Sequence, residues 1–485
     1  MRRFIVSTLL ALALPLTTHA ATFIVTNTAD SGAGSLRQAL INAGTDTTFP
    51  RVIQFGASFP QGGVIELQTT LPTWSNDILK IEGNGRMPVL DGRNAVRILV
   101  VAAGTREITL RGLTFRNGRS TAGVGGCVWH SAPAANTSLF VHDSHFQNCK
   151  AVGNQNNAYG GAIAWVSPGS WIFIYDSVFT GNAIGVIGNS SLKEAFGGAI
   201  LLSGSRLEIV RTHFSGNTTE RVGGHVQNLG GAVYAAATSS VLMTDSEFDS
   251  NRVVDADADG VISAGGAATL LCQQDDCQLS AVNVGFIDNT VSGVDTGGGA
   301  LVTAGGQLSL INAGFSGNRA SGGWGGALLA LPGKLSARHL SFQNNEAAAG
   351  AHLALSGVEV TQWQWSLIGP AAAGSGTSCE LSSTSLTGPT SANLFESACD
   401  VLSVSGAIVG PVGPLTLDDS VFPATLAPGA GSPAIDPDYP QDACFTTSDA
   451  RGMPRPQDGN GDGIARCDVG AYEVQGPQVF ADGFE

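Results

Sequence analysis

Apolar and polar residues alternate with period two along most of this chain. In the stretch RLEIVRTHF, Leu207 and Ile209 fall on one side, and the phase shifts before Phe214. Such alternation is typical of short β-strands with one buried face, and no repeat holds a helical period. The chain is therefore predicted to consist of short strands joined by tight turns.

Three landmarks recur along the chain. A glycine pair is followed 16 to 20 residues later by a phenylalanine, and an asparagine usually stands three positions past that phenylalanine. The pairs begin at Gly125, Gly160, Gly197, Gly230, Gly265, Gly298 and Gly325. The phenylalanines are Phe146, Phe179, Phe214, Phe248, Phe286, Phe315 and Phe342, and the asparagines are Asn182, Asn217, Asn251, Asn289, Asn318 and Asn345. Two copies, Phe115 with Asn117 and Phe146 with Asn148, are one residue short. Self-similarity at a period of roughly 30 residues is typical of a solenoid.

The repeat predicts an all-β fold, a right-handed parallel β-helix. A coil of short strands cannot close on itself, so it must stack on its neighbours to bury its apolar face. Like residues would then lie about 4.8 Å apart from rung to rung, and the phenylalanines would form a stack in the core. Asparagine tolerates left-handed backbone and bonds locally, so its column would hold one corner. The glycines would permit positive φ and close approach at the opposite corner.

Both ends of the chain depart from the repeat. Residues 1–20 have the charged start, apolar stretch and small cleavage residues of a signal peptide. Residues 21–111 are predicted to form an N-terminal cap and the first coils, with Ser35 and Gln38 at capping-box spacing before a short helix. The repeats would occupy residues 112–368. Residues 369–475 would form a disulfide-stapled C-terminal cap, and residues 476–485 a tail.

Composition and charge narrow the class of protein. Of the 485 residues 43% are hydrophobic and 13% charged, which excludes a disordered chain. A net charge of −15 without any basic run argues against nucleic acid as a partner. After the signal peptide no apolar stretch is long enough to span a bilayer. Eight cysteines in an exported chain indicate disulfides. The simplest of the 105 connectivities joins the neighbouring pairs Cys127/Cys149, Cys272/Cys277, Cys379/Cys399 and Cys444/Cys467.

Several stretches resemble known exported β-helix proteins of bacteria. TFIVTNTADSGAGSLRQALINA, with RVIQFGASF and LTFRNG, resembles the start of proteins with a Cys-Ser-Leu-Arg-Glu-Ala-type cap, although Gly34 and Gln38 stand where that family has Cys and Glu. The Gly-Gly-Ala-Ile and Phe-x-x-Asn repeats look like those of polymorphic outer-membrane proteins. Residues 431–473 are similar to the choice-of-anchor C-terminal domain. The resemblance implies an exported protein, secreted or attached to the cell surface or outer membrane of a Gram-negative bacterium.

The segments between each asparagine and the next glycine pair vary in length, whereas the coil body does not. They are predicted to be loops that leave the helix at one corner and stack into one flank. Loops on a rigid scaffold are where binding residues usually lie, and neutral variation of solvent loops is the alternative. The candidate binding residues on or beside this flank are Tyr159, Lys193, Glu194, Phe196, Arg221, His225 and Trp324.

A polar column stands three residues before each phenylalanine. Its members are Asp143, Asp176, Arg211, Asp245, Asn283, Asn312 and His339. On neighbouring rungs Asp143 and Asp176 would approach the ~5–5.5 Å separation of a retaining glycosidase pair. The interpretation favoured here is structural: each residue bonds a local turn, and Arg211 offsets the negative charge. No catalytic constellation is identifiable, so no catalytic residue is assigned.

Two acidic turns have the start of a calcium loop, with oxygen ligands at positions 1, 3 and 5 and glycine at 6. One carries Asp255, Asp257 and Asp259, and the other Asp458, Asn460 and Asp462. Both lack the bidentate Glu at position 12, so affinity would be weak. An ordinary polar turn is the alternative, and no cofactor is otherwise required.

The leading functional prediction is a non-catalytic secreted or surface-associated protein that acts in adhesion or in glycan or protein binding through the flank. A polysaccharide lyase or glycoside hydrolase on the same fold is the alternative, and a structural envelope protein is the third. Fold alone does not decide among them, because β-helices host both adhesins and sugar enzymes.

Overall fold

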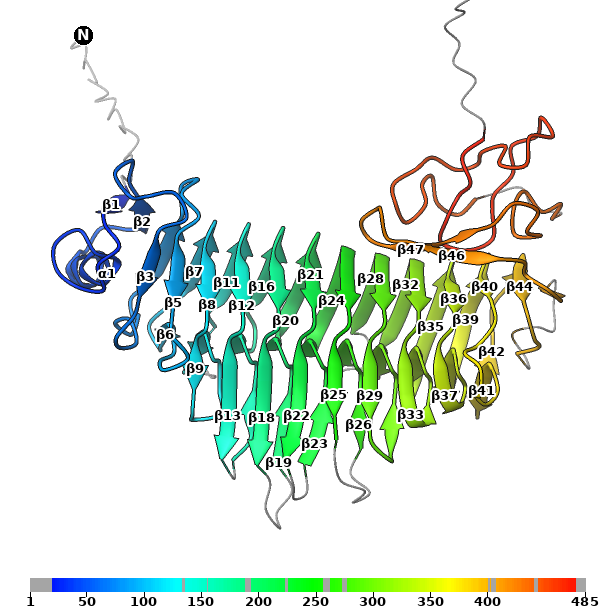
Figure 1. The fold of residues 1–485 in the computed structure, drawn as a ribbon, viewed down its shortest axis with the longest axis horizontal. Coiled ribbons are helices and arrows are strands. Elements are labelled where there is room, and N and C mark those ends of the chain that lie inside the picture. The colour runs from blue at the N-terminus through cyan, green and yellow to red at the C-terminus, as the bar shows by residue number, and fades with distance from the viewer. Residues whose placement is uncertain are drawn as a thin grey trace, which may run out of the picture.

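The protein is a parallel β-helix of about 11 turns, as the computed structural model shows. The structure describes residues 20–132, 136–154, 156–187, 193–222, 226–255, 262–272, 277–399, 402, 407–439 and 444–476. The predicted signal peptide, except Ala20, and the tail beyond Gly476 lie outside these residues. Almost all strand pairs are parallel, and the coils stack along one long axis (Figure 1). The predicted all-β solenoid is confirmed.

Each full coil contributes strands to three faces. The first face, directly after the glycine pairs, contains β6 (Leu99–Val101), β10 (Val128–His130), β15 (Ile163–Val166), the starts of β20 (Ile200–Val210) and β24 (Val233–Asp249), β27 (Ala268–Cys272), β31 (Leu301–Ala304), β34 (Leu328–Ala330), β38 (Leu353–Ser356) and β41 (Cys379–Ser382). The second contains β1 (Ala21–Val25), β2 (Arg51–Phe55), β4 (Ile78–Glu82), β7 (Glu107–Arg111), β11 (Ser138–His142), β16 (Trp171–Tyr175), parts of β20 and β24, β28 (Gln278–Ile287), β32 (Gln307–Ser316), β35 (Gly333–Arg338), β39 (Val358–Gln364), β42 (Ser385–Leu386) and β43 (Thr390–Ser391). The third contains β3 (Val64–Glu66), β5 (Val89–Asp91), β8 (Thr114–Arg116), β12 (His145–Gln147), β17 (Val178–Thr180), β21 (His213–Ser215), the ends of β24, β28 and β32, β36 (Ser341–Gln343), β40 (Leu367–Ile368), β44 (Asn393–Phe395) and β45 (Ala407–Val409).

The predicted aromatic stack runs through the core behind the third face. Consecutive rings from Phe115 to Phe342 lie 4.7–5.2 Å apart and are tilted by at most 12°. All of these rings are fully buried. Their burial supplies a large apolar contribution at one position of every rung.

The buried asparagines form a hydrogen-bonded ladder beside this stack. Asn251 donates from Nδ2 to the Phe214 carbonyl at 2.9 Å and to Asn289 Oδ1 at 3.0 Å. Its own Oδ1 accepts from the backbone N–H and the Nδ2 of Asn217. The polar atoms of each such side chain are therefore paired inside the core, as buried amides require.

The left-handed backbone at this corner belongs to the residue before the ladder asparagine. Gly216 and Ser250, for example, have φ of 63° and 54°. The prediction that the ladder asparagines themselves adopt left-handed backbone is therefore wrong. In the two copies that are one residue short, Asn117 and Asn148 do occupy the left-handed position, with φ of 52° and 54°. Cys149 then takes the ladder position, and its N–H donates to Asn182 Oδ1.

The glycine pairs form a second corner for two different reasons. Gly197 has φ of +73°, which L-residues rarely adopt. A Cβ on Gly198 would lie 1.9 Å from the Gly231 carbonyl of the next rung. The first glycine thus supplies the turn and the second allows the rungs to approach.

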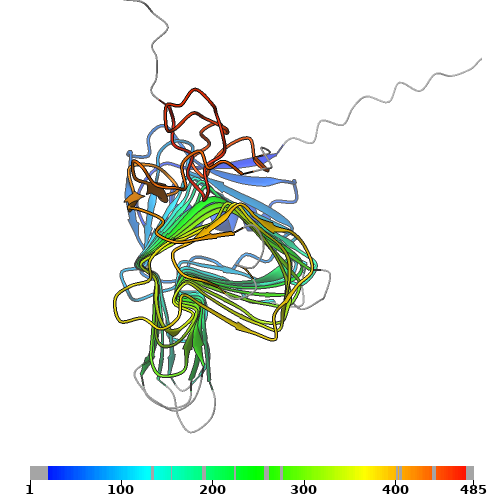
Figure 2. The same ribbon diagram turned by 90° about the vertical axis from the view of Figure 1, so that its right-hand side faces the viewer.

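The segments between each asparagine and the next glycine pair are strands, and the prediction of loops is wrong. They form a fin of two packed layers that projects from the helix (Figure 2). Outgoing strands are β9 (Arg119–Ser120), β13 (Lys150–Asn154), β18 (Ala183–Ile187), β22 (Thr218–Val222), β25 (Arg252–Val254), β29 (Thr290–Ser292), β33 (Arg319–Trp324) and β37 (Glu346–Ala349). Returning strands are β14 (Ala158–Tyr159), β19 (Lys193–Phe196), β23 (Val226–Leu229), β26 (Ser263–Ala264) and β30 (Thr296–Gly297). Parallel pairing with the rungs on either side satisfies their backbone groups, and Ile184, Val186 and Val226 belong to the small core between the layers.

A helix closes the N-terminal end. Helix α1 (Leu36–Thr45) packs on β1 and β2 with Leu36 and Leu40 buried. Ser35 is its N-cap and accepts from the Gln38 N–H, as predicted. The Gln38 side chain donates to Asn42 rather than back to Ser35, so only half of a capping box forms.

The C-terminal lobe (residues 411–439 and 444–476) folds back over the outside of the third face (Figure 1). It contains the antiparallel pair β46 (Leu415–Asp418) and β47 (Thr425–Pro428). Its Ala424 N–H donates to Glu247, 177 residues earlier in the chain. Buried carboxylates hold the irregular remainder: Asp468, for example, accepts from the backbone N–H groups of Asp436 and Val474.

Four disulfides join the neighbouring cysteines. They are Cys127–Cys149, Cys272–Cys277, Cys379–Cys399 and Cys444–Cys467. Cys379–Cys399 crosslinks the final coils, and Cys444–Cys467 crosslinks the C-terminal lobe. Among the described residues no helix is long and apolar enough to cross a membrane.

Candidate binding groove

A groove runs along the helix axis where the returning layer of the fin meets the first face. On the fin side, one residue per rung stands directly before the glycine pair. In register these are Tyr159, Phe196, Leu229, Ala264, Gly297 and Trp324. On the helix side the facing outward positions are Ala164, Leu201, Tyr234, Thr269, Val302, Leu329, Ala354 and Glu380. Most of these residues are apolar.

The groove is filled at its N-terminal end by its own side chains. Phe196 stacks on Tyr234 with ring centroids 4.4 Å apart, and Leu201 and Leu229 pack beside them. Burial raises the pKa of Tyr234 to about 12, with a smaller contribution from the charge of Glu194. These rungs therefore form a closed apolar cluster.

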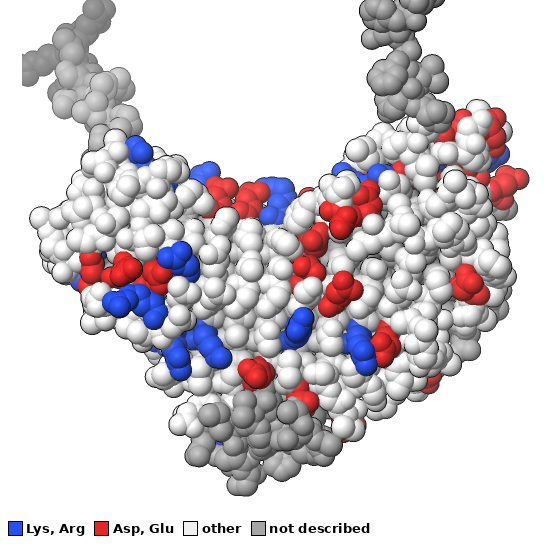
Figure 3. All heavy atoms as spheres, viewed as in Figure 1, with Lys and Arg blue, Asp and Glu red and all other residues white. Residues whose placement is uncertain are grey.

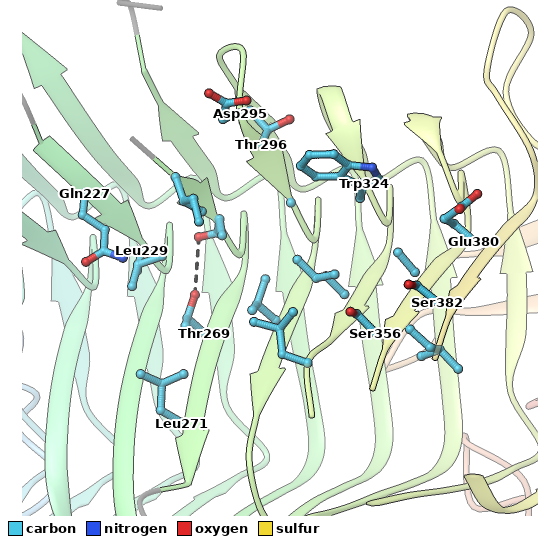
Figure 4. Close-up of a pocket in the computed structure, with 18 residues that line it drawn as sticks. Gln227, Leu229, Thr269, Leu271, Asp295, Thr296, Trp324, Ser356, Glu380 and Ser382 are labelled. Atoms are coloured by element: carbon cyan, nitrogen blue, oxygen red, sulfur yellow. Dashed lines mark hydrogen bonds between the residues drawn. The ribbon is translucent and has the colours of Figure 1, made fainter. Parts of the chain in front are cut away.

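The groove opens where the fin column becomes small, at Ala264 and Gly297. The opening is a hollow of about 550 Å³, lined from the rung of Leu229 to that of Glu380. These two residues are five rungs apart along the paired strands, so the hollow extends roughly 24 Å. Trp324, whose surface is 51% exposed, stands on the fin wall between Asp295 and Glu380 (Figure 4).

The hollow combines an apolar lining with hydroxyl and carboxylate groups. Thr269 and Thr296 are tied to neighbouring carbonyls, at Ala264 (3.3 Å) and Ser321 (2.8 Å). Asp295 and Glu380 bring negative charge, and the 18 described residues that line the hollow include no Lys, Arg or His. The site can therefore bury an apolar surface and hydrogen-bond the polar edge of the same ligand.

Of the predicted binding residues, one lies in the open hollow and three lie at the filled end of the groove. Trp324 lines the open hollow, whereas Phe196 is only 7% exposed inside the closed cluster. Tyr159 donates a short hydrogen bond to Glu194, and Asn157 donates to both. The pKa of Tyr159 is raised, mainly by burial of the phenol and next by its hydrogen bond to Glu194.

Of the three remaining predicted flank residues, the structure describes the side chain of Lys193 alone. Lys193 begins strand β19 and is half-buried. The Arg221 side chain and all of His225 lie outside the described residues. The structure thus brings Trp324 to the hollow and places Tyr159, Glu194 and Phe196 at its filled end.

The sequence reasoning missed Asp295, Glu380 and the whole helix-side wall. A signal existed, because period-two alternation places Leu201, Tyr234, Val302 and Leu329 at outward positions where polar residues are usual. Apolar residues at successive outward positions indicate that something covers that face.

The polar column before the phenylalanines is a corner with left-handed backbone. Its members have φ between 46° and 54°, for example 49° at Asp143 and 51° at Asp176. Asp143 pairs with Arg111 at 3.1 Å and Asp176 with Arg211 at 2.6 Å. The hydrogen bond from Arg211 is the main cause that lowers the pKa of Asp176. Asp143 and Asp176 thus each pair with a different arginine, and the two carboxylates do not share a proton.

The acidic turns use their side chains to fold the turn. Asp458 accepts from the backbone N–H groups of Gly461, Asp462 and Gly463, and Asn460 Oδ1 accepts from Asp462. In the other turn Asp255 accepts from Ser263 at 2.8 Å, while Asp257 and Asp259 lie outside the described residues. Within the described part of the chain no group of three or more His, Cys, Asp or Glu side chains could hold a metal ion.

The charged side chains are unevenly spread over one face of the molecule (Figure 3). On this face, acidic groups gather on the C-terminal lobe, and much of the surrounding surface is uncharged.

The fold and the groove together define a β-helix with an elongated amphipathic site. No family model, curated protein or solved structure matches this chain.

Proposed function

We propose that this protein binds an extended glycan in the groove between the fin and the first face. The observation that carries the proposal is the half-exposed Trp324 in a hollow of about 550 Å³ that follows the helix axis. A sugar ring has an apolar face that stacks on an indole and a rim of hydroxyls that carboxylates and threonines can bond. The length of the hollow suits an oligosaccharide rather than a single sugar.

A glycan array with the purified mature protein tests this proposal. Trp324→Ala removes the central ring and is expected to weaken binding at least tenfold, because buried aromatic anchors dominate binding sites. Trp171→Ala is the matched control, since Trp171 is 56% exposed on the second face, away from the groove. Equal binding by wild type and Trp324→Ala would refute the groove as the site.

A polysaccharide-cleaving enzyme is the second candidate, and Asp295 and Glu380 beside Trp324 favour it. Asp295 and Glu380 stand three rungs apart, roughly 14 Å along the axis, which exceeds the ~5–9.5 Å of a glycosidase pair, so a single carboxylate would have to act on a given bond. Reducing-sugar and unsaturated-uronate assays on the glycans that bind would detect cleavage. Product formed by wild type but not by Glu380→Gln would establish the enzyme instead of the binding protein.

We further propose that the protein is exported and acts at the bacterial cell surface. The signal-peptide pattern and the resemblance of residues 431–473 to choice-of-anchor domains support this. Fractionation of cells that express the full chain tests it, and retention in the cytoplasm would contradict it.

A further inference from the structure

We propose that the groove selects glycans that carry free amino groups over neutral or acidic ones. This inference rests on the proposed glycan-binding function. It follows from the charges of the groove: Asp295 and Glu380 line the hollow, and none of its described lining residues is cationic. Ammonium groups along a bound chain would each meet one of the two carboxylates, and a uronate would meet only repulsion.

The place of the indole strengthens the preference for a cation. Trp324 stands between the two carboxylates along the axis and exposes 51% of its surface (Figure 4). The face of an indole attracts an ammonium group within about 6 Å of its centroid. One chain lying along the groove could therefore place a sugar face or an amine on the ring and further amines beside each carboxylate.

The carboxylates of the hollow differ from those elsewhere in the repeat. Asp143 and Asp176 are each paired with an arginine, so an incoming amine would have to compete for them. By contrast, the described residues that line the hollow include no arginine that could pair with Asp295 or Glu380. The net charge of −15 adds a long-range field of the same sign.

Two hexasaccharides that differ only in acetylation test the inference. The hexamer of 2-amino-2-deoxyglucose and its N-acetylated counterpart are titrated calorimetrically at low salt and about pH 6, where amines are protonated. The free amine is expected to bind about tenfold more tightly to wild type. The advantage should shrink as salt is added, since exposed charges are screened within about 10 Å at 0.1 M.

Variants assign the effect to the groove. Asp295→Asn with Glu380→Gln should bring the ratio of the two affinities close to one, whatever happens to the affinity for the acetylated hexamer, because the amides still hydrogen-bond sugar hydroxyls but carry no charge. Glu66→Gln with Asp419→Asn is the control, because both residues are exposed outside the groove and the net charge changes equally. Equal affinity of wild type for the two hexamers overturns the charge preference alone. If wild type binds neither hexamer, and Trp324→Ala binds the glycans of the array as tightly as wild type does, the glycan site is overturned as well.

Discussion

Replacing Asn251 by leucine tests whether the buried ladder holds the coils together. Leucine keeps a side chain of similar size but removes one acceptor oxygen and one NH2 group, which donates two hydrogen bonds, from the core. The N–H and the Nδ2 of Asn217 then lose their acceptor, at 3.0 and 2.9 Å, and the Phe214 carbonyl loses its donor, at 2.9 Å. Asn289 Oδ1 still receives the backbone N–H of position 251.

The size of the effect follows from these three groups. A buried polar group left without a partner costs about 1–3 kcal/mol. Burial of the leucine side chain offsets part of this, by about 1.5–3 kcal/mol. The three groups together cost about 3–9 kcal/mol, so after this offset Asn251→Leu is expected to lower the free energy of unfolding by about 4 kcal/mol.

Urea unfolding followed by far-UV circular dichroism measures this loss. Asn154→Leu is the matched control: Asn154 is exposed at the end of β13, and its replacement should change stability by no more than about 0.5 kcal/mol. Hydrogen exchange of the Asn217 amide should also accelerate in the ladder variant. A loss below about 1 kcal/mol, with unchanged exchange at Asn217, would refute the ladder as a stabilising element.

Three further outcomes follow from the structure. Changing Cys127 and Cys149 together to serine should lower stability by about 3 kcal/mol, because the bond closes a 22-residue loop, and an unchanged urea midpoint would contradict this. Burial raises the pKa of Asp468 and of Glu473 to about 7, so their contribution to stability is present in acid and is lost as pH rises from about 4 through 7. The C-terminal lobe should therefore melt at a lower temperature at about pH 8 than at pH 5, and Asp468→Asn should reduce that difference; a flat profile in wild type would argue against it. Calcium binding at the turn of Asp458 stays a prediction from the sequence: it requires that millimolar calcium raise and a chelator lower the melting temperature, and the absence of any shift would contradict it.

The coil itself could be predicted from the sequence. Phenylalanine, asparagine and the glycine pair recur because every rung repeats the same local geometry, so like residues stack on like. The α1 cap was predictable for the same local reason, since Ser35 meets Gln38 only three residues away. The predicted left-handed asparagines occur only where the motif is one residue short, at Asn117 and Asn148.

The fin, the groove and the docking of the C-terminal lobe were decided by tertiary structure. A stretch such as Thr218–Val222 has polar residues typical of a loop, and it becomes a strand because Ala183–Ile187 and Arg252–Val254 offer paired edges on both sides. The groove joins residues from two layers whose register depends on that pairing. The lobe meets the third face through contacts such as Ala424 with Glu247. A local pattern determines what repeats within one rung, whereas the pairing of segments of unequal length and of distant segments depends on the assembled fold.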